Sequence, residues 1–164
     1  MILTLPVDEA RLASVCDQAR YDNRKIVTTN GVFDILHYGH LLLLQYCAHK
    51  GDILIVGVNS DESARQLGKG EGRPIQGSES RAELVGAMRC VYLVVIFPEP
   101  DPCVFLGIVK PDFHVKGGDY DIETMPETAV VRKHGGMVEL LPIIEGYSTS
   151  TIIAKIRGKE ALYE

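Results

Sequence analysis

The feature that most constrains the fold is the stretch from Lys25 to Lys50, which reads KIVTTNGVFDILHYGHLLLLQYCAHK. A short β-branched apolar run at 26–29 leads into a polar, glycine-bearing turn and then into a leucine-rich segment of helical length. A strand that passes into a helix presents free backbone N–H groups and the positive end of the helix dipole. The stretch therefore predicts a phosphate at the turn.

The alternation of strand and helix continues along the chain of 164 residues. Apolar runs at 53–58, 91–97, 113–115 and 137–141 predict four further strands, with helical segments between them. Strands that alternate with helices are typical of a parallel sheet with right-handed crossovers. We therefore expect one α/β domain of Rossmann type, with a five-stranded parallel sheet and helices on both faces.

The domain organisation follows from the position of the first strand. Residues 1–24 are expected to form an amino-terminal helical extension that packs outside the core, and residues 25–164 to form the α/β domain. Internal repeats are not found in the sequence.

Composition narrows the classes of partner. The formal net charge of -5 and the pI of about 5.5 argue against general affinity for nucleic acid or for anionic membranes. Asp8 and Glu9 follow a very short apolar start, unlike a signal peptide, and no apolar run approaches the roughly 20 residues that cross a bilayer. Four cysteines without CxxC spacing are expected to be reduced thiols, so we expect a cytoplasmic protein.

Polar clusters follow the predicted strands. In open parallel sheets, ligands bind beyond the carboxyl ends of the strands. We therefore expect five clusters to converge on one cleft, at residues 30–40, 59–61, 69–73, 116–120 and 148–151.

His37 and His40 stand three residues apart at the helix entrance, so both can face the same small volume. Neither the dinucleotide fingerprint GxGxxG nor the P-loop pattern is present. The pair can cap the helix, bind a metal or contact a phosphate. No third metal ligand is near in the sequence, and two histidines around Gly39, behind Asp34, favour the phosphate.

The remaining clusters each allow a structural and a functional interpretation. Lys69 and Arg73 are either solvated charges or cations on a glycine-rich loop that closes over phosphates. The segment 116–120, KGGDY, is either a plain turn or a place where backbone approaches a base or ribose. The hydroxyl-rich segment 148–151 is expected to cap the last helix, and its amides can also hold phosphates.

Several motifs, taken in their order along the chain, make a resemblance to one protein family specific. The segment TNGVFDILHYGH resembles the HxGH signature of the cytidylyltransferase-like nucleotidylyltransferases, and VNSD, RPI, KGGDY and STST follow in the family's order between Lys25 and Arg157. The resemblance implies that His37 and His40 contact the nucleotide phosphates and that Lys69 closes over both substrates. It also implies that hydroxyls at 148–151 hold the β- and γ-phosphates.

Within this family the chain is most similar to standalone D-glycero-β-D-manno-heptose 1-phosphate adenylyltransferases. Ile143 stands where glycerol-3-phosphate cytidylyltransferases carry an arginine, and Ser150 stands where a threonine is usual. The resemblance implies transfer of AMP from ATP to the heptose 1-phosphate, with release of pyrophosphate and Mg²⁺ carried by the triphosphate. It further implies surface-glycan synthesis and a homodimer. A resident metal is not expected, because no third ligand lies near the two histidines in the sequence. Two alternatives remain. One is cytidylyl or guanylyl transfer to another small phosphate or phosphonate, such as glycerol 3-phosphate, and the other is a non-catalytic nucleotide-binding sensor.

Three groups of candidate residues result. The catalytic candidates are His37, His40 and Lys69. The candidates for substrate binding are Asn59, Asp61, Arg73 and Arg81. The candidates for nucleotide binding are Asn30, Gly31, Val32, Phe33, Asp34, Gly39, Lys116, Gly117, Gly118, Asp119, Ser148, Thr149, Ser150 and Thr151.

Overall fold

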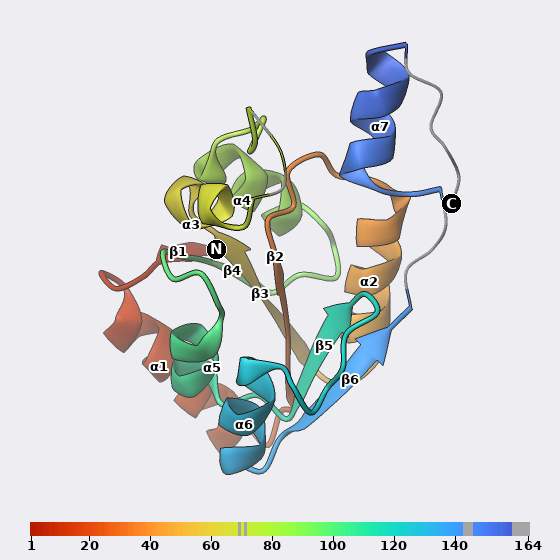
Figure 1. The fold of residues 1–164 in the computed structure, drawn as a ribbon. Helices are drawn as coiled ribbons and strands as arrows, with labels where there is room; N and C mark the ends of the chain where they lie inside the picture. Colours follow the sequence, from red (N-terminus) through yellow and green to blue (C-terminus); the bar gives the residue numbers. More distant parts are fainter. Residues whose placement is uncertain (69, 71, 143–145, 159–164) are drawn as a thin grey trace.

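The computed structural model describes residues 1–68, 70, 72–142 and 146–158. In this part of the chain one parallel sheet of six strands runs through the molecule in the order β1-β4-β3-β2-β5-β6 (Figure 1). Seven helices connect or follow the strands within the described residues. The strands are β1 (Ile2–Thr4), β2 (Ile26–Gly31), β3 (Ile53–Asn59), β4 (Leu93–Phe97), β5 (Phe113–Gly117) and β6 (Met137–Leu141). The helices are α1 (Glu9–Tyr21), α2 (Tyr38–Ala48), α3 (Asp61–Gln66), α4 (Ser78–Gly86), α5 (Cys103–Val109), α6 (Pro126–Lys133) and α7 (Thr149–Ile156).

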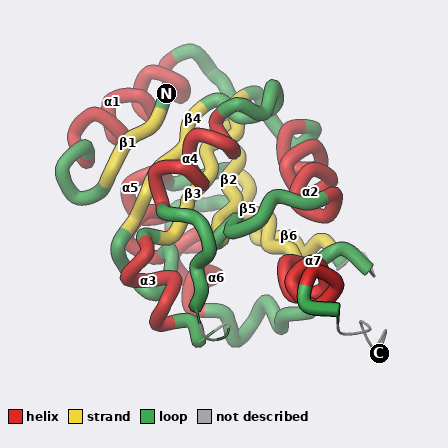
Figure 2. The backbone as a smooth tube through the Cα atoms, turned by 90° about the horizontal axis from the view of Figure 1, so that it is seen from above, coloured by secondary structure: helices red, strands yellow, loops and turns green. Residues whose placement is uncertain are grey.

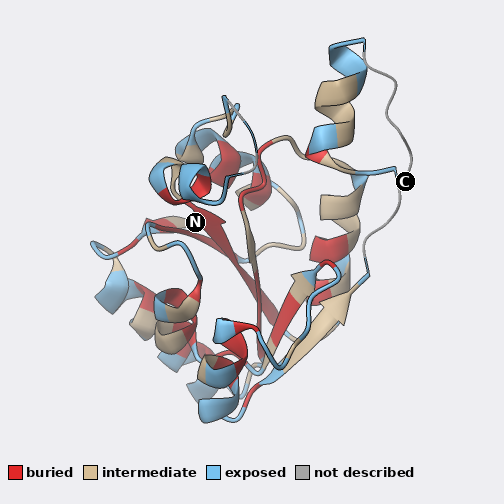
Figure 3. Ribbon diagram, in the orientation of Figure 1, coloured by how far each residue is buried: buried red, intermediate tan, exposed pale blue. Residues whose placement is uncertain are grey.

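The sheet is covered on both faces, as the apolar strand sequences require. Every residue of β3 and β4 is buried, which is the pattern of strands between two helical layers. Because successive side chains point to opposite faces, each strand feeds both layers. Ile26, Ile53 and Leu93 pack with α1 and α5 in one layer. Val27, Leu54 and Val94 pack with α2 and α4 in the other, and Figure 3 shows the buried residues concentrated along the sheet.

The predicted fold class is confirmed, with one additional strand. The sheet has six strands rather than five because Ile2–Thr4 pairs in parallel with Val94–Ile96 at the edge. The prediction that the leading helix packs outside the core is wrong: Leu12, Cys16 and Ala19 of α1 are buried in the layer that also contains Phe105 of α5. The predicted division at residue 24 stays a prediction about domain organisation.

The order of the strands in the sheet indicates where a ligand-binding crevice is expected. The chain moves from β2 to β3 and β4 on one side, then crosses back to β5 and β6 on the other (Figure 2). The order of the strands reverses between β2 and β5, which pair through Val27–Phe113 and Thr28–His114. In such sheets a crevice opens above the carboxyl ends of the two strands. These ends are Gly31 and Gly117.

Helix α7 stands apart from the two layers. Its first residues lie beside the carboxyl ends of the strands, and the rest of the helix projects away from the domain beyond α2 (Figure 1). No helix in the described ranges is long and apolar enough to cross a membrane.

Candidate active site

A cavity of 510 Å³ lies at the carboxyl ends of β2, β3 and β5, at the point where the strand order reverses. It brings together residues from all five polar clusters that were expected to converge on one cleft. The candidates that line it are Asn30, Gly31, Val32, Phe33, Asp34, His40, Asn59, Arg73, Lys116, Gly117 and Thr149.

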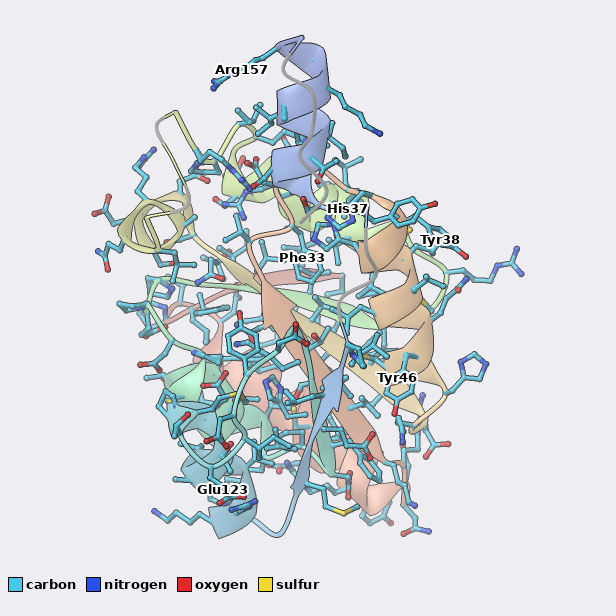
Figure 4. The ribbon with its side chains drawn as sticks, turned by 45° about the vertical axis from the view of Figure 1, so that its right-hand side comes forward. Phe33, His37, Tyr38, Tyr46, Glu123 and Arg157 are labelled. Carbon is cyan, nitrogen blue, oxygen red and sulfur yellow. The ribbon has the colours of Figure 1, made fainter. Side chains whose placement is uncertain are left out.

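The two histidines lie against each other at the start of α2. Their rings stack with centroids 3.7 Å apart and an interplanar angle of 22°. His40 lines the cavity and also packs against the ring of Phe33, at 5.0 Å between centroids. His37 is the residue that precedes the first turn of α2, and Figure 4 shows it beside Phe33 below the start of α7. The pair therefore forms one polar surface at the helix entrance.

Burial affects the protonation of His37. Desolvation lowers the pKa of this imidazole below its usual value, so the neutral form dominates at neutral pH. Its Nδ1 atom is buried and has no hydrogen-bond partner among the described residues. Such a buried ring nitrogen without a partner is rare in folded proteins.

Glycine is required between the histidines. A Cβ atom on Gly39 would lie 3.1 Å from Cε1 and Nδ1 of His37 and 3.3 Å from the carbonyl oxygen of Tyr147. Any larger residue would therefore displace the His37 ring or the segment that precedes α7. This contact favours glycine at position 39 of this chain.

Asp34 holds the loop that carries the predicted cations. Its carboxylate is fully buried and accepts a hydrogen bond from Arg73 Nε at 2.9 Å. It also accepts from the backbone N–H groups of Ile75 and Gln76, at 2.7 and 3.0 Å. Although Asp34 borders the cavity, these contacts make it an anchor for the loop between α3 and α4.

Arg81 is fully buried, with a side-chain exposure of 0%. It donates to the carbonyl oxygens of Val32, Asn59 and Gln76, and to Oδ1 of Asp61 at 2.7 Å. The structure thus places Arg81 and Asp61 behind the cavity, where they connect three loops. Their predicted contact with substrate stays a prediction, and their observed contacts are with protein.

The start of α7 is capped by its own hydroxyls, as expected. Ser148 Oγ accepts a hydrogen bond from the backbone N–H of Thr151 at 3.0 Å and lies 2.8 Å from Thr151 Oγ1. Thr149 is buried and lines the cavity, whereas Ser150 is exposed and points elsewhere. Thr149 is therefore the one residue of the segment 148–151 that lines the cavity.

Several of the described candidates do not line the cavity. Lys69 cannot be compared with it, because this residue falls outside the described residues. Gly118 has a φ of 138°, which only glycine adopts readily, and it allows the chain to turn after β5. The described candidates that do not line the cavity are His37, Gly39, Asp61, Arg81, Gly118, Asp119, Ser148, Ser150 and Thr151.

Sequence reasoning missed part of the wall. Glu127 is buried at the first turn of α6, and its Oε1 accepts from Lys116 Nζ at 2.7 Å. Lys116 Nζ also donates to Asn30 Oδ1 at 3.1 Å. The only signal was the proline before Glu127, which marks a helix start but no function. The other missed residues are Leu43, Leu67, Pro100, Asp101, Pro102, Thr124, Met125 and Pro126.

A resident metal was not expected, and the acidic residues near the cavity are engaged otherwise. Asp34 binds Arg73 and two amides, Asp61 binds Arg81, and Glu127 binds Lys116. Within the described part of the chain, no group of three or more His, Cys, Asp or Glu side chains is arranged to hold a metal ion.

The chain resembles known proteins over most of its length. One curated relative, the D-beta-D-heptose 1-phosphate adenylyltransferase of Bordetella bronchiseptica, is 48% identical over 134 residues, which are 82% of this chain and 83% of the relative. The Bifunctional protein HldE of Geobacter sulfurreducens is 42% identical over 145 residues. The matched region is 88% of this chain but 29% of that protein, so this chain corresponds to a minor part of the bifunctional relatives.

Solved structures agree with the fold. The lipopolysaccharide core biosynthesis protein from Thermoplasma volcanium superposes with a TM-score of 0.61 at 32% identity, over 76% of this chain and 99% of that one. A pantoate-beta-alanine ligase from Francisella tularensis has a TM-score of 0.55 at 13% identity, over 92% of this chain and 69% of that one, and supports the fold alone.

The Cytidylyltransferase-like family model matches residues 28–155, a span that contains both histidines and the start of α7. The chain therefore belongs to the cytidylyltransferase-like family.

Proposed function

We propose that this protein transfers AMP from ATP to D-glycero-β-D-manno-heptose 1-phosphate, giving ADP-heptose and pyrophosphate. The reaction class is supported by the stacked histidines at a helix entrance that opens into a cavity of 510 Å³. The substrate is supported by the identity of 48% with a relative named as a heptose 1-phosphate adenylyltransferase, whose length this chain covers to 83%.

The reaction needs no covalent intermediate. A phosphate oxygen of the sugar 1-phosphate attacks the α-phosphorus of ATP and forms a new P–O bond, while the bond from that phosphorus to the bridging oxygen of pyrophosphate breaks. The attacking oxygen is already ionised, so no base has to remove a proton from it. The enzyme therefore acts by alignment and by stabilising the negative charge that develops on the phosphate oxygens.

The histidines stabilise that charge. A neutral imidazole, the form that burial favours for His37, still carries one N–H donor. His40 presents its ring to the cavity, and His37 supports this ring from behind at a centroid distance of 3.7 Å. Backbone N–H groups at 30–33 and at the start of α7 complete the nucleotide site. Lys69 bridges the two substrates, and Arg73, which lines the cavity, contacts the acceptor.

Mg²⁺ accompanies the triphosphate in this proposal. Phosphate oxygens and waters supply most ligands of Mg²⁺ in such sites, and the protein needs no dedicated cage for it. When bound, the ion neutralises charge on the departing pyrophosphate.

We also propose that the enzyme acts in the cytoplasm, as a homodimer that contributes to the synthesis of a surface glycan. The helix α7 supports the dimer because its apolar residues Ile152 and Ile153 are only half-buried and Ile156 is 77% exposed. The same helix of a second copy offers a complementary apolar surface about a twofold axis.

A substrate panel tests the proposed function. The protein is incubated with ATP, CTP or GTP together with D-glycero-β-D-manno-heptose 1-phosphate, mannose 1-phosphate or glycerol 3-phosphate, and pyrophosphate release is measured. We expect the highest kcat/KM for ATP with the heptose 1-phosphate. Preference for CTP with glycerol 3-phosphate would favour the cytidylyltransferase alternative, and no release in any combination would favour a nucleotide sensor.

A further inference from the structure

The side of the cavity opposite α2 contains a buried ion pair that the reaction described above does not use. Lys116 Nζ lies 2.7 Å from Glu127 Oε1, and the two side chains are 16% and 5% exposed. The same ammonium donates to Asn30 Oδ1 at 3.1 Å and lies 5.7 Å from the ring centroid of Tyr120. All four residues line the cavity.

Stability alone does not account for this pair. Removing two charges from water costs several kcal/mol, and apolar residues of similar size often stabilise a fold as well or better. Lys116 lies near the end of β5 and Glu127 in the first turn of α6, so the pair joins a strand of the sheet to a helix that already packs against α5 and β6, with Val131 buried in the core. A buried pair in the wall of a cavity instead suggests a ligand that needs both a donor and an acceptor.

The charges indicate which part of a ligand fits here. The carboxylate of Glu127 cancels the ammonium charge of Lys116, and Asp101 adds a further acid to the same cavity wall. This side is therefore a poor place for a phosphate, whereas the start of α2 and the start of α7 offer free backbone N–H groups. A neutral group that both donates and accepts hydrogen bonds suits a carboxylate beside an ammonium.

We propose that Glu127, Lys116 and Asn30 bind the hydroxyl groups of the acceptor sugar and determine which sugar 1-phosphate is used. Tyr120 supplies an aromatic face for the apolar side of the sugar ring. This inference rests on the proposed function, and it reassigns Lys116 from the base and ribose of the nucleotide to the acceptor. The ribose also carries hydroxyl groups, and the KM values for the two substrates distinguish it from the acceptor.

Selectivity should follow from the same contacts. A site that hydrogen-bonds a substrate hydroxyl rejects an analogue without it, because the protein groups are then left unpaired in a buried place. Hydrogen bonds to charged groups are the strong ones, so their loss should be visible in the kinetics. Glu127 should therefore raise the selectivity among sugar 1-phosphates without affecting the use of ATP.

The test uses the full chain with Glu127→Gln and Lys116→Met, and with Glu123→Gln as the matched control. Glu123 is an exposed acid four residues before Glu127 and pairs with Arg132, away from the cavity (Figure 4). We expect the KM for D-glycero-β-D-manno-heptose 1-phosphate to rise about tenfold or more in Glu127→Gln, with the KM for ATP within about twofold of wild type. The control should leave both values unchanged.

Two results would overturn the inference. A rise in the KM for ATP alone would assign the pair to the ribose, and unchanged kinetics in Glu127→Gln would assign it to structure only. If both variants fail to fold, the wild-type enzyme decides: equal kcat/KM for the heptose 1-phosphate and its monodeoxy analogues would refute hydroxyl recognition, and strong discrimination would support it.

The proposed function can fail separately. If wild-type protein releases no pyrophosphate with any sugar 1-phosphate, titration calorimetry with the heptose 1-phosphate and with ATP still distinguishes the two claims. Selective loss of sugar 1-phosphate binding in Glu127→Gln would then support the site without the reaction. Equal binding of the heptose 1-phosphate by wild type and variant would reject the site as well.

Discussion

At the scale of single residues, the candidate site depends on how closely side chains approach one another. The ring of His37 fits between Gly39 and His40 only because glycine has no side chain at that position. The sequence predicted that both histidines lie at the helix entrance, and they do. It did not predict their stacking, because ring orientation depends on χ angles that neighbouring segments select.

The histidine pair supports a prediction for His37→Ala. His37 supports the ring of His40, which lines the cavity, and disrupting the pair should lower turnover as the loss of a donor to a developing charge does, by about 10²–10³. The ring of His37 is half-buried, so its loss should leave the fold intact. We expect kcat to fall by at least about a hundredfold. Pyrophosphate release measures the turnover, and thermal unfolding measures the stability.

An exposed histidine provides the control. His134→Ala removes an imidazole far from the cavity and should retain wild-type kcat. Near-normal turnover in His37→Ala would refute the phosphate role of the pair.

Another histidine affects stability rather than turnover. His114 is fully buried in β5, with Nδ1 2.9 Å from Thr28 Oγ1. Desolvation, with a smaller contribution from the charge of Lys116, lowers its pKa to about 3. The folded protein thus keeps His114 neutral at pH values where the unfolded chain, with a pKa of about 6.5, binds a proton.

The pH dependence has a definite sign. Below about pH 6.5 the unfolded state gains a proton that the folded state does not bind, so the free energy of unfolding falls by up to about 1.4 kcal/mol per pH unit until about pH 3. Urea unfolding at pH 7, 6 and 5 should show a steeper loss for wild type than for His114→Asn, which retains polar atoms beside Thr28. Parallel pH profiles for the two proteins would contradict this account.

At the scale of elements, α7 has a polar first turn beside the cavity and an apolar later part that lies apart from the domain. Its first turn is capped by Ser148 and contributes Thr149 to the cavity, while its later residues form an apolar face that the domain does not cover. The hydroxyl cap was predicted, because the segment 148–151 contains the residue types that accept from free helix amides. The projection of the helix was not predicted, since the direction of a terminal helix depends on what it packs against.

The apolar face of α7 leads to a prediction about assembly. If a second copy covers it, Ile156→Asp places a charge in the interface and should shift the protein from dimer to monomer. Light scattering after gel filtration measures the mass of each variant. Lys155→Asp changes an exposed neighbouring residue and should leave the dimer in place. A monomeric wild type at all concentrations would refute the dimer.

Helix α6 shows the limit of motif reasoning. Its sequence predicts a short amphipathic helix that starts near Glu127, and the structure has it at Pro126–Lys133. That Glu127 meets Lys116 in the cavity wall, eleven positions earlier in the chain, depends on the packing of α6 against α5 and β6. No local pattern carries this information.

At the scale of the whole molecule, the order of the strands concentrates the candidate residues at one edge of the sheet. The alternation of apolar runs with helices was sufficient to predict a parallel sheet and the edge of the sheet at which the cavity lies. The sixth strand was missed because Ile2–Thr4 is very short and pairs with Val94–Ile96, about ninety positions later in the chain. Pairings of this kind are non-local, and propensity carries no signal for them.

The two core layers each contain a buried thiol, Cys16 on the side of α1 and Cys47 on the side of α2. Burial raises the pKa of Cys16 to about 11 and that of Cys47 to about 12, so neither is a reactive thiolate at neutral pH. An alkylating reagent will therefore modify each thiol only when its own layer opens. The wild-type chain thus has one buried thiol in each core layer. The order in which Cys16 and Cys47 are alkylated will identify the layer that opens first during unfolding.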